Sequence, residues 1–201
     1  MKKFLLFTLL IAATIISAFK VSEDPLPLGA AMPKADVKMK DISGQDITLK
    51  GSLKENGLLV MFSCNTCPVV IKHQARTKEI CQYALDNKVG VVLLNSNEGS
   101  RSDGDSYDDM KEYAKDQGYK WNYAVDKNNE LADAFGANRT PEIFLFDKNG
   151  KLVYHGAIDD SPNNPDGVSR KHLREAITEM VGGKEVSVKQ SRSVGCSIKR
   201  I

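Results

Sequence analysis

Excess charge of either sign is almost absent from this sequence, and long apolar runs are absent after its first 19 residues. Lysine and arginine number 28 against 26 aspartate and glutamate residues, and two of the basic residues, Lys2 and Lys3, belong to the N-terminal segment. Nucleic-acid binding needs a basic face, and a membrane span needs a long apolar run. We therefore expect no nucleic-acid partner and no later span. The remaining chain of about 180 residues, which lacks internal repeats, suits one domain with a sizeable core.

The N-terminal segment has the pattern of a secretory signal peptide. Lys2 and Lys3 precede a largely apolar run from Phe4 to Phe19 that ends in the small residues Ser17 and Ala18. Cleavage after about Ala18 makes residues 1–18 the signal and leaves no membrane contact in the mature protein. The alternative is an uncleaved anchor, although the run is shorter than the ~20 residues that span a bilayer. Both predict export, to the periplasm if the source is bacterial, with membrane-tethered or extracellular locations as alternatives.

Two continuous apolar runs, Gly57–Phe62 and Val89–Leu94, are typical of strands buried on both faces of a parallel sheet. A helix is predicted between them over residues 64–86. Hairpins are predicted at 37–50 and 142–154, a short strand at 123–125, and further helices at 106–117, 129–135 and 169–180. The segment Asn95–Asp105 between the second strand and the next helix is predicted to be a polar loop. The fold class is therefore α/β with a mixed sheet.

Cysteines are few, at positions 64, 67, 81 and 196, and a C-x-x-C motif beside a βα pattern indicates a redox pair. Cys64 and Cys67 lie just beyond the first buried strand, on the first turn of the predicted helix. Backbone N–H groups and the helix dipole stabilise a thiolate there. Cys64 is expected to be the more exposed of the two. Residues three apart on a helix are neighbours, so the pair can close into a disulfide.

The other two cysteines have different surroundings. Cys81 follows Cys67 by fourteen residues, roughly 21 Å along a helix, whereas disulfide Cα atoms lie within about 7 Å of each other. We expect Cys81 to be a buried apolar side chain. Cys196 lies in a polar tail beyond the last helix. Three interpretations stay open for it: a third redox cysteine that folds back to the motif, a free thiol, or half of a structural disulfide.

Metal and cofactor sites are not expected. A structural zinc site needs four ligands, and His73, His155 and His172 have no ligand-like spacing from the C-x-x-C motif. Pro68 occupies the position where a c-type haem motif has histidine. Asp103-Gly104-Asp105 departs from a calcium-loop pattern at Tyr107 and Asp108, so it is interpreted as a solvated loop.

The strand–CNTC–helix unit, the Thr140-Pro141 pair and the hairpin that follows it resemble the thioredoxin superfamily over residues 27–181, leaving 182–201 as a C-terminal tail. The resemblance implies a thioredoxin-like three-layer sandwich with an N-terminal hairpin and an inserted βα unit within residues 88–119. It implies a cis peptide bond at Pro141, which packs beside the redox cysteines and shapes the groove for a partner's cysteine. Thr140 supplies backbone contacts in that groove.

Three segments look like an exported, peroxiredoxin-like branch of that superfamily, the redoxin domains whose labels mention alkyl hydroperoxide reductase and thiol-specific antioxidant proteins. They are Phe62–Pro68, Tyr154–Asp160 and Gly195–Lys199. A peroxiredoxin carries Pro-x-x-x-Thr-x-x-Cys. Counted back from Cys64, Met61 and Gly57 occupy the threonine and proline positions, so the signature that activates peroxide is absent.

We therefore expect an exported thiol–disulfide oxidoreductase in which Cys64 attacks a disulfide and Cys67 resolves the mixed disulfide. The substrate is a protein or small-molecule disulfide. A separate thiol electron donor or acceptor is implied, because the sequence contains no donor domain. Two alternatives stay open: a thiol peroxidase that uses Cys64, and a non-catalytic module that binds a metal or a protein.

Overall fold

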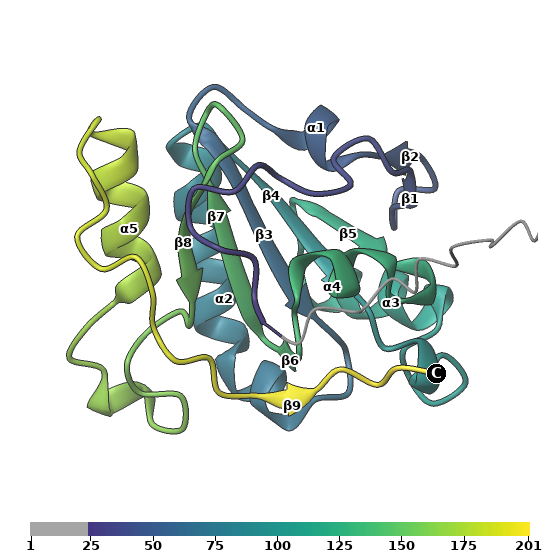
Figure 1. Cartoon of the computed structure of the whole chain (residues 1–201). Helices are drawn as coiled ribbons and strands as arrows, with labels where there is room; N and C mark the ends of the chain where they lie inside the picture. The colour runs from purple at the N-terminus through teal and green to yellow at the C-terminus, as the bar shows by residue number, and fades with distance from the viewer. Residues whose placement is uncertain (1–23) are drawn as a thin grey trace, which may run out of the picture.

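A computed structural model describes residues 24–201, so the predicted signal peptide lies outside the described residues. The centre is a five-stranded sheet in the order β5-β4-β3-β7-β8 (Figure 1). β3 is parallel to β4 and antiparallel to β7, which confirms the predicted mixed sheet. The strands are β3 (Gly57–Ser63), β4 (Val89–Asn95), β5 (Asn122–Val125), β7 (Glu142–Phe146) and β8 (Leu152–Gly156).

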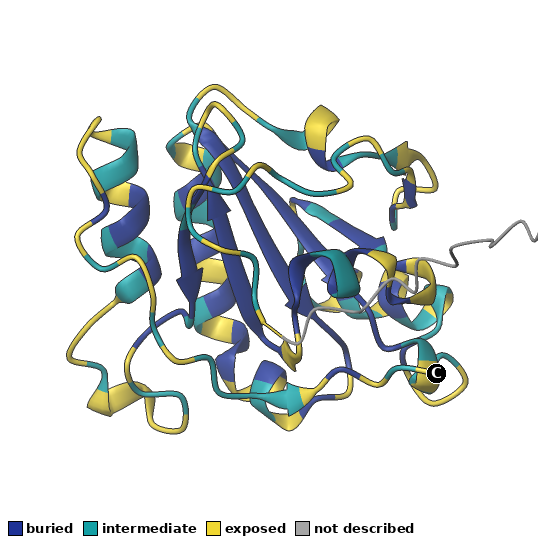
Figure 2. Ribbon diagram, in the orientation of Figure 1, coloured by how far each residue is buried: buried dark blue, intermediate teal, exposed yellow. Residues whose placement is uncertain are grey.

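Both faces of the sheet are covered. Side chains alternate along a strand, so Leu59 and Met61 of β3 point to one apolar cluster while Leu58, Val60 and Phe62 point to the other. Helices α2 (Pro68–Asp86), α3 (Tyr107–Gln117) and α5 (His172–Val181) contribute to the first cluster. Helices α1 (Leu49–Ser52) and α4 (Glu130–Phe135) contribute to the second. Figure 2 shows the buried strands enclosed between these layers, the three-layer sandwich that was predicted.

The N-terminal hairpin is present but short. β1 (Met39–Lys40) pairs antiparallel with β2 (Asp46–Ile47). Residues 48–50, predicted to extend the hairpin, instead begin α1, because the Thr48 side chain accepts a hydrogen bond from the Gly51 N–H and caps that helix. The helix predicted at 106–117 is present as α3, and Ser106 and Asp109 form a reciprocal capping box at its start.

The interval between β4 and β7 is long because it holds α3, β5 and α4, together with the 3₁₀ helices η1 (Glu98–Ser100) and η2 (Lys127–Asn129). β4 and α3 fall within the segment predicted to contain an inserted βα unit. β5 pairs parallel with β4 and forms one edge of the sheet. None of the helices in residues 24–201 is long and apolar enough to cross a membrane.

The C-terminal tail follows the sheet rather than leaving it. After α5, the His155 N–H of β8 donates to the Lys189 carbonyl, and the Ser191 N–H donates to the His155 carbonyl. The tail then crosses the end of the sheet, where β9 (Cys196–Ser197) pairs antiparallel with β6 (Arg139–Thr140) (yellow in Figure 1). A third 3₁₀ turn, η3 (Pro165–Gly167), lies in the loop between β8 and α5.

Candidate functional site

Three of the four cysteines meet where β3 ends and α2 begins. Cys67 and Cys196 form a disulfide with their Cα atoms 6.1 Å apart, and Cys64 is a free, buried thiol in the same small cluster. This bond excludes the free-thiol interpretation of Cys196 and leaves the other two, a third redox cysteine and half of a structural disulfide. Cys81 lies apart as a buried side chain in the core, as expected.

The predicted helix start at Cys64 is wrong, because α2 begins at Pro68 and Cys67 is its N-cap residue. Cys67 has φ −70° and ψ 121°, the extended conformation that a following proline imposes. Proline at the first helical position costs no intrahelical hydrogen bond. Cys64 to Cys67 thus form a connecting loop, whose conformation depends on contacts outside the helix.

The expectation that Cys64 is the more exposed cysteine is also wrong. Its exposed fraction is 0%, against 4% for Cys67. Burial raises the pKa of the Cys64 thiol, and the charge of Asp105 raises it further, while a hydrogen bond with Thr140 lowers it. With the tail in place, Cys64 has no contact with solvent, and its raised pKa favours the thiol over the thiolate.

Thr140 contacts all three cysteines. Its Oγ1 lies 3.4 Å from Cys64 Sγ, its carbonyl oxygen lies 3.3 Å from Cys67 Sγ, and its backbone pairs with Cys196 in the β6–β9 register. The Thr140-Pro141 peptide bond is cis, as the resemblance implied. Thr140 is therefore the residue at which the segment before β7, the tail and the C-x-x-C motif all meet.

A buried carboxylate supports the C-x-x-C loop from outside. Asp105 Oδ1 accepts from the Asn65 backbone N–H at 2.7 Å, and Oδ2 accepts from the Thr66 hydroxyl at 2.9 Å. Asp105 also accepts from the side-chain amides of Asn95 and Asn97. Its exposed fraction is 0%, so the interpretation of residues 103–105 as a solvated loop is wrong for Asp105. The sequence carried no signal for this role beyond the polar character of Asn95–Asp105.

A second buried pair supports the segment before the cis bond. Glu142 Oε1 lies 2.8 Å from His155 Nε2, and its Oε2 accepts from the backbone N–H groups of Asn138 and Arg139. Both side chains are under one-tenth exposed. The backbone of β6 is thus fixed by a carboxylate that sequence analysis did not single out. Arg139 itself has an exposed side chain.

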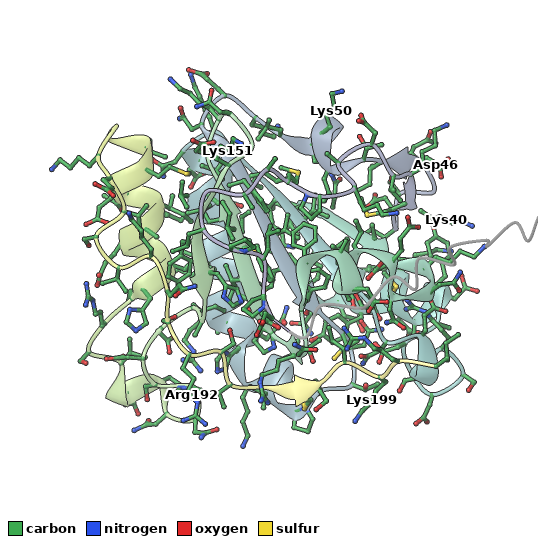
Figure 3. The ribbon with its side chains drawn as sticks, viewed as in Figure 1. Lys40, Asp46, Lys50, Lys151, Arg192 and Lys199 are labelled. Atoms are coloured by element: carbon green, nitrogen blue, oxygen red, sulfur yellow. A yellow bond between two sulfur atoms is a disulfide. The ribbon has the colours of Figure 1, made fainter. Side chains whose placement is uncertain are left out.

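The last residues of the tail dock along the loops beside the cysteines. Ile198 is buried against the second apolar cluster, and its N–H donates to the Asn138 carbonyl. The Gly99 N–H donates to the Lys199 carbonyl, and the Lys199 N–H donates to Asn97 Oδ1. Figure 3 shows the path of this segment between Arg192 and Lys199, along one end of the sheet.

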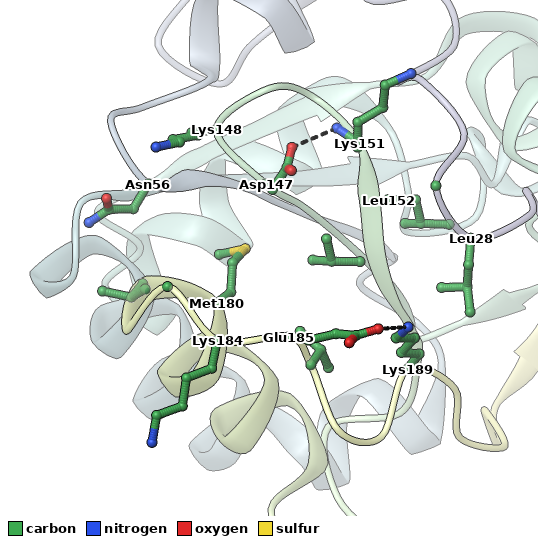
Figure 4. Close-up of a pocket in the computed structure, with 15 residues that line it drawn as sticks. Leu28, Asn56, Asp147, Lys148, Lys151, Leu152, Met180, Lys184, Glu185 and Lys189 are labelled. Atoms are coloured by element: carbon green, nitrogen blue, oxygen red, sulfur yellow. Dashed lines mark hydrogen bonds and ion pairs between the residues drawn. The ribbon is translucent and has the colours of Figure 1, made fainter.

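A cavity of about 590 Å³ lies between the β7–β8 turn and the C-terminal end of α5 (Figure 4). Its lining includes the apolar side chains of Leu152 and Met180 and the basic residues Lys148 and Lys184. Asn56, which also lines it, directly precedes β3, whose other end leads to Cys64. No cysteine lines this cavity, and in residues 24–201 no cluster of three or more His, Cys, Asp or Glu side chains suits a metal ion.

Comparison with known proteins agrees with the fold. A structure of an uncharacterized conserved protein from Geobacillus kaustophilus is 34% identical and has a TM-score of 0.80, covering 86% of this chain and 92% of that one. A hypothetical protein from Sinorhizobium meliloti 1021 is 31% identical with a TM-score of 0.81, covering 89% and 97%. The thiol-disulfide oxidoreductase ResA of Bacillus anthracis is 25% identical over 140 residues, which are 70% of this chain and 75% of that protein. Because the Redoxin family model matches residues 27–171, most of the chain, this protein belongs to the Redoxin family.

Proposed function

We propose that this protein is a thiol–disulfide oxidoreductase that works through Cys64, Cys67 and Cys196. The observation that carries the proposal is the Cys67–Cys196 disulfide, closed beside the free Cys64 thiol at the cis Thr140-Pro141 bond. The relationship to ResA, named a thiol-disulfide oxidoreductase, supports the same chemistry. Residues 1–18 direct export, to the periplasm in a bacterium.

The reduced protein starts the reaction with three thiols and a released tail. The Cys64 thiolate attacks one sulfur of a substrate disulfide, forming a mixed disulfide and expelling the first substrate thiolate. The Cys67 thiolate then attacks Cys64 Sγ, forming Cys64–Cys67 and expelling the second substrate thiolate. Two electrons have passed to the substrate, whose two thiolates take up the protons lost by Cys64 and Cys67.

The tail completes the sequence. The Cys196 thiolate attacks Cys67 Sγ, which forms the Cys67–Cys196 bond and breaks the Cys64–Cys67 bond. Cys64 leaves as a thiolate and takes up the proton that Cys196 lost. A separate dithiol donor restores the reduced state. Its thiolate attacks Cys196, which is partly exposed whereas Cys67 is only 4% exposed, and its second thiol then releases Cys196 and leaves the donor oxidised.

Insulin reduction by the mature protein with a dithiol donor tests this function, with single serine variants of each cysteine. We expect Cys64→Ser and Cys67→Ser to abolish turnover. Cys196→Ser should accumulate Cys64–Cys67 after one turnover, as read by peptide mapping. Cys81→Ser is the matched control and should retain the wild-type rate.

Insulin reduction that survives in the Cys64→Ser and Cys67→Ser variants would contradict the proposal. Rapid consumption of hydrogen peroxide that needs Cys64, without insulin reduction, would make the protein a peroxidase instead. The absence of the peroxidase signature favours disulfide exchange over that outcome.

A further inference from the structure

The tail lies against Cys64, because Cys196 packs on the small cluster that Cys64 forms with Cys67 and Val70. Cys64 has no exposed surface, and Cys196 is bonded to its neighbour Cys67. A reacting sulfur must come within bonding distance of Cys64, and release of the tail would open the volume beside it that residues 195–200 fill. The contacts of those residues therefore describe what the vacated groove accepts.

Part of that docking depends only on backbone. β9 pairs with β6 in an antiparallel register that sets Cys196 opposite Thr140 and Ser197 opposite Arg139. The Ile198 N–H donates to the Asn138 carbonyl, and the backbone of Lys199 bonds both Gly99 and Asn97. These bonds require an extended polypeptide, and a small disulfide cannot supply them.

The position before the cysteine is selective. A Cβ atom built on Gly195 would lie 2.2 Å from the Thr140 carbonyl oxygen and 2.7 Å from its carbonyl carbon. These are backbone atoms of the segment held by Glu142, so a side chain cannot be accommodated by a rotamer change. The groove accepts glycine at this position and excludes every larger residue.

The groove is also selective at two of the positions that follow the cysteine, those of Ile198 and Arg200. Ile198 is 6% exposed and packs into the apolar cluster that contains Leu131 and Phe135. Arg200 Nε donates to Asp133 Oδ1 at 3.0 Å, and its Nη2 donates to the Ala137 carbonyl. The groove therefore favours a large aliphatic side chain two residues after the cysteine and a basic one four residues after it.

We propose that the disulfide substrate is an extended polypeptide segment that replaces the tail, with glycine immediately before its cysteine and a large aliphatic residue two positions after it. The proposal rests on the proposed function and names its substrate class. Residues 195–200 then act as an internal copy of the substrate: they close the groove when the protein is oxidised and leave it when the protein is reduced.

The test uses the reduced full chain carrying Cys196→Ser, whose tail cannot lock itself, and a nine-residue peptide with the sequence of residues 193–201. The peptide cysteine is blocked as a mixed disulfide with 5-thio-2-nitrobenzoate, so attack on it releases a coloured thiolate. Two further peptides carry the equivalents of Gly195→Ala and Ile198→Ser. The reaction of each peptide with free dithiothreitol corrects for intrinsic reactivity, and 5,5′-dithiobis(2-nitrobenzoate) serves as the small disulfide.

We expect the parent peptide to react about tenfold or more faster than either altered peptide, once each rate is divided by its rate with dithiothreitol. Equal rates for the three peptides, with the small disulfide still reduced, would overturn the substrate proposal and leave the proposed function standing. A lack of reaction with every peptide and with the small disulfide would overturn both.

Discussion

The Asp105 carboxylate accepts a hydrogen bond from the backbone N–H of Asn65 at 2.7 Å, across a separation of 40 residues. The C-x-x-C loop is thus held by a side chain from the segment between β4 and α3. Four donors in total converge on this carboxylate, two from the loop and two from Asn95 and Asn97. The conformation of the redox loop and that of residues 95–105 are therefore coupled.

Replacing Asp105 with alanine should destabilise the oxidised protein by about 2–4 kcal/mol, because it leaves several buried donors without an acceptor. Urea unfolding followed by circular dichroism measures this loss. Asp103→Ala is the matched control, since Asp103 is exposed, and we expect it to change stability by less than ~0.5 kcal/mol. Equal stability of the two variants would contradict the role given to Asp105.

Cys64 should react slowly with iodoacetamide while the Cys67–Cys196 bond is closed. Burial raises its pKa, so at a given pH a smaller fraction is thiolate than in an ordinary thiol. The alkylation rate should rise with pH and level off only above the ordinary thiol pKa. Reduction releases the tail in our proposal, exposes Cys64 and should raise the rate at pH 8 by about tenfold or more.

Mass spectrometry of the alkylated peptides gives both rates and includes an internal control. Cys81 is fully buried in the core, and burial raises its pKa as well, so it should stay unlabelled in both redox states. If Cys64 in the oxidised protein were labelled as fast as glutathione, the tail would not cover it in solution.

Ile198→Ala should make the Cys67–Cys196 bond easier to reduce. The disulfide and the docked tail form together, so a loss of about 2–4 kcal/mol of docking shifts the equilibrium with glutathione toward the thiols by about thirtyfold or more. Ile198→Val removes one methylene and should shift it by less than about tenfold. An unchanged equilibrium in Ile198→Ala would mean that the tail stays docked after reduction.

Asp159→Ala should destabilise the protein by about 3 kcal/mol. Its carboxylate pairs with Arg76 of α2 at 2.6 Å, and the two side chains are only 2% and 14% exposed, so the variant leaves a largely buried guanidinium without its counter-ion. Asp36→Ala breaks the exposed pair with Lys50 and should cost less than about 1 kcal/mol. Thermal unfolding of both variants measures the two losses of stability. Equal losses would show that burial of the ion pair does not determine the cost of breaking it.

The central strands could be predicted from the sequence because a strand that is buried on both faces appears there as a continuous apolar run. The short, continuous apolar runs in β3 and β4 are typical of strands buried on both faces of a sheet, and the resemblance to the thioredoxin superfamily marked Thr140-Pro141 as the segment that faces the motif. Burial of Cys81 followed from helical spacing alone.

The docking of the C-terminal tail over Cys64 and Cys67 could not be predicted from the sequence, because it depends on contacts between segments that are far apart in the chain. The tail around Cys196 is polar and has no periodicity, so nothing in it indicates a strand, and β9 exists only because β6 offers it a partner. Asp105 follows exposed residues in the sequence. It is buried because donors from other segments, such as the Asn65 backbone N–H, bind its carboxylate. The exposure of Cys64 was misjudged for the same reason, since the segment that buries it lies far along the chain.

Cys196 lies 129 residues after Cys67, which sets an order on synthesis. At ~5–20 residues per second, the ribosome needs on the order of ten seconds to add Cys196 once Cys67 is made. During that time the nascent chain presents Cys64 and Cys67 to each other, and to any other thiol, without their final partner. The disulfide that closes the site can therefore form only after pairings among Cys64, Cys67 and Cys81 have already become possible.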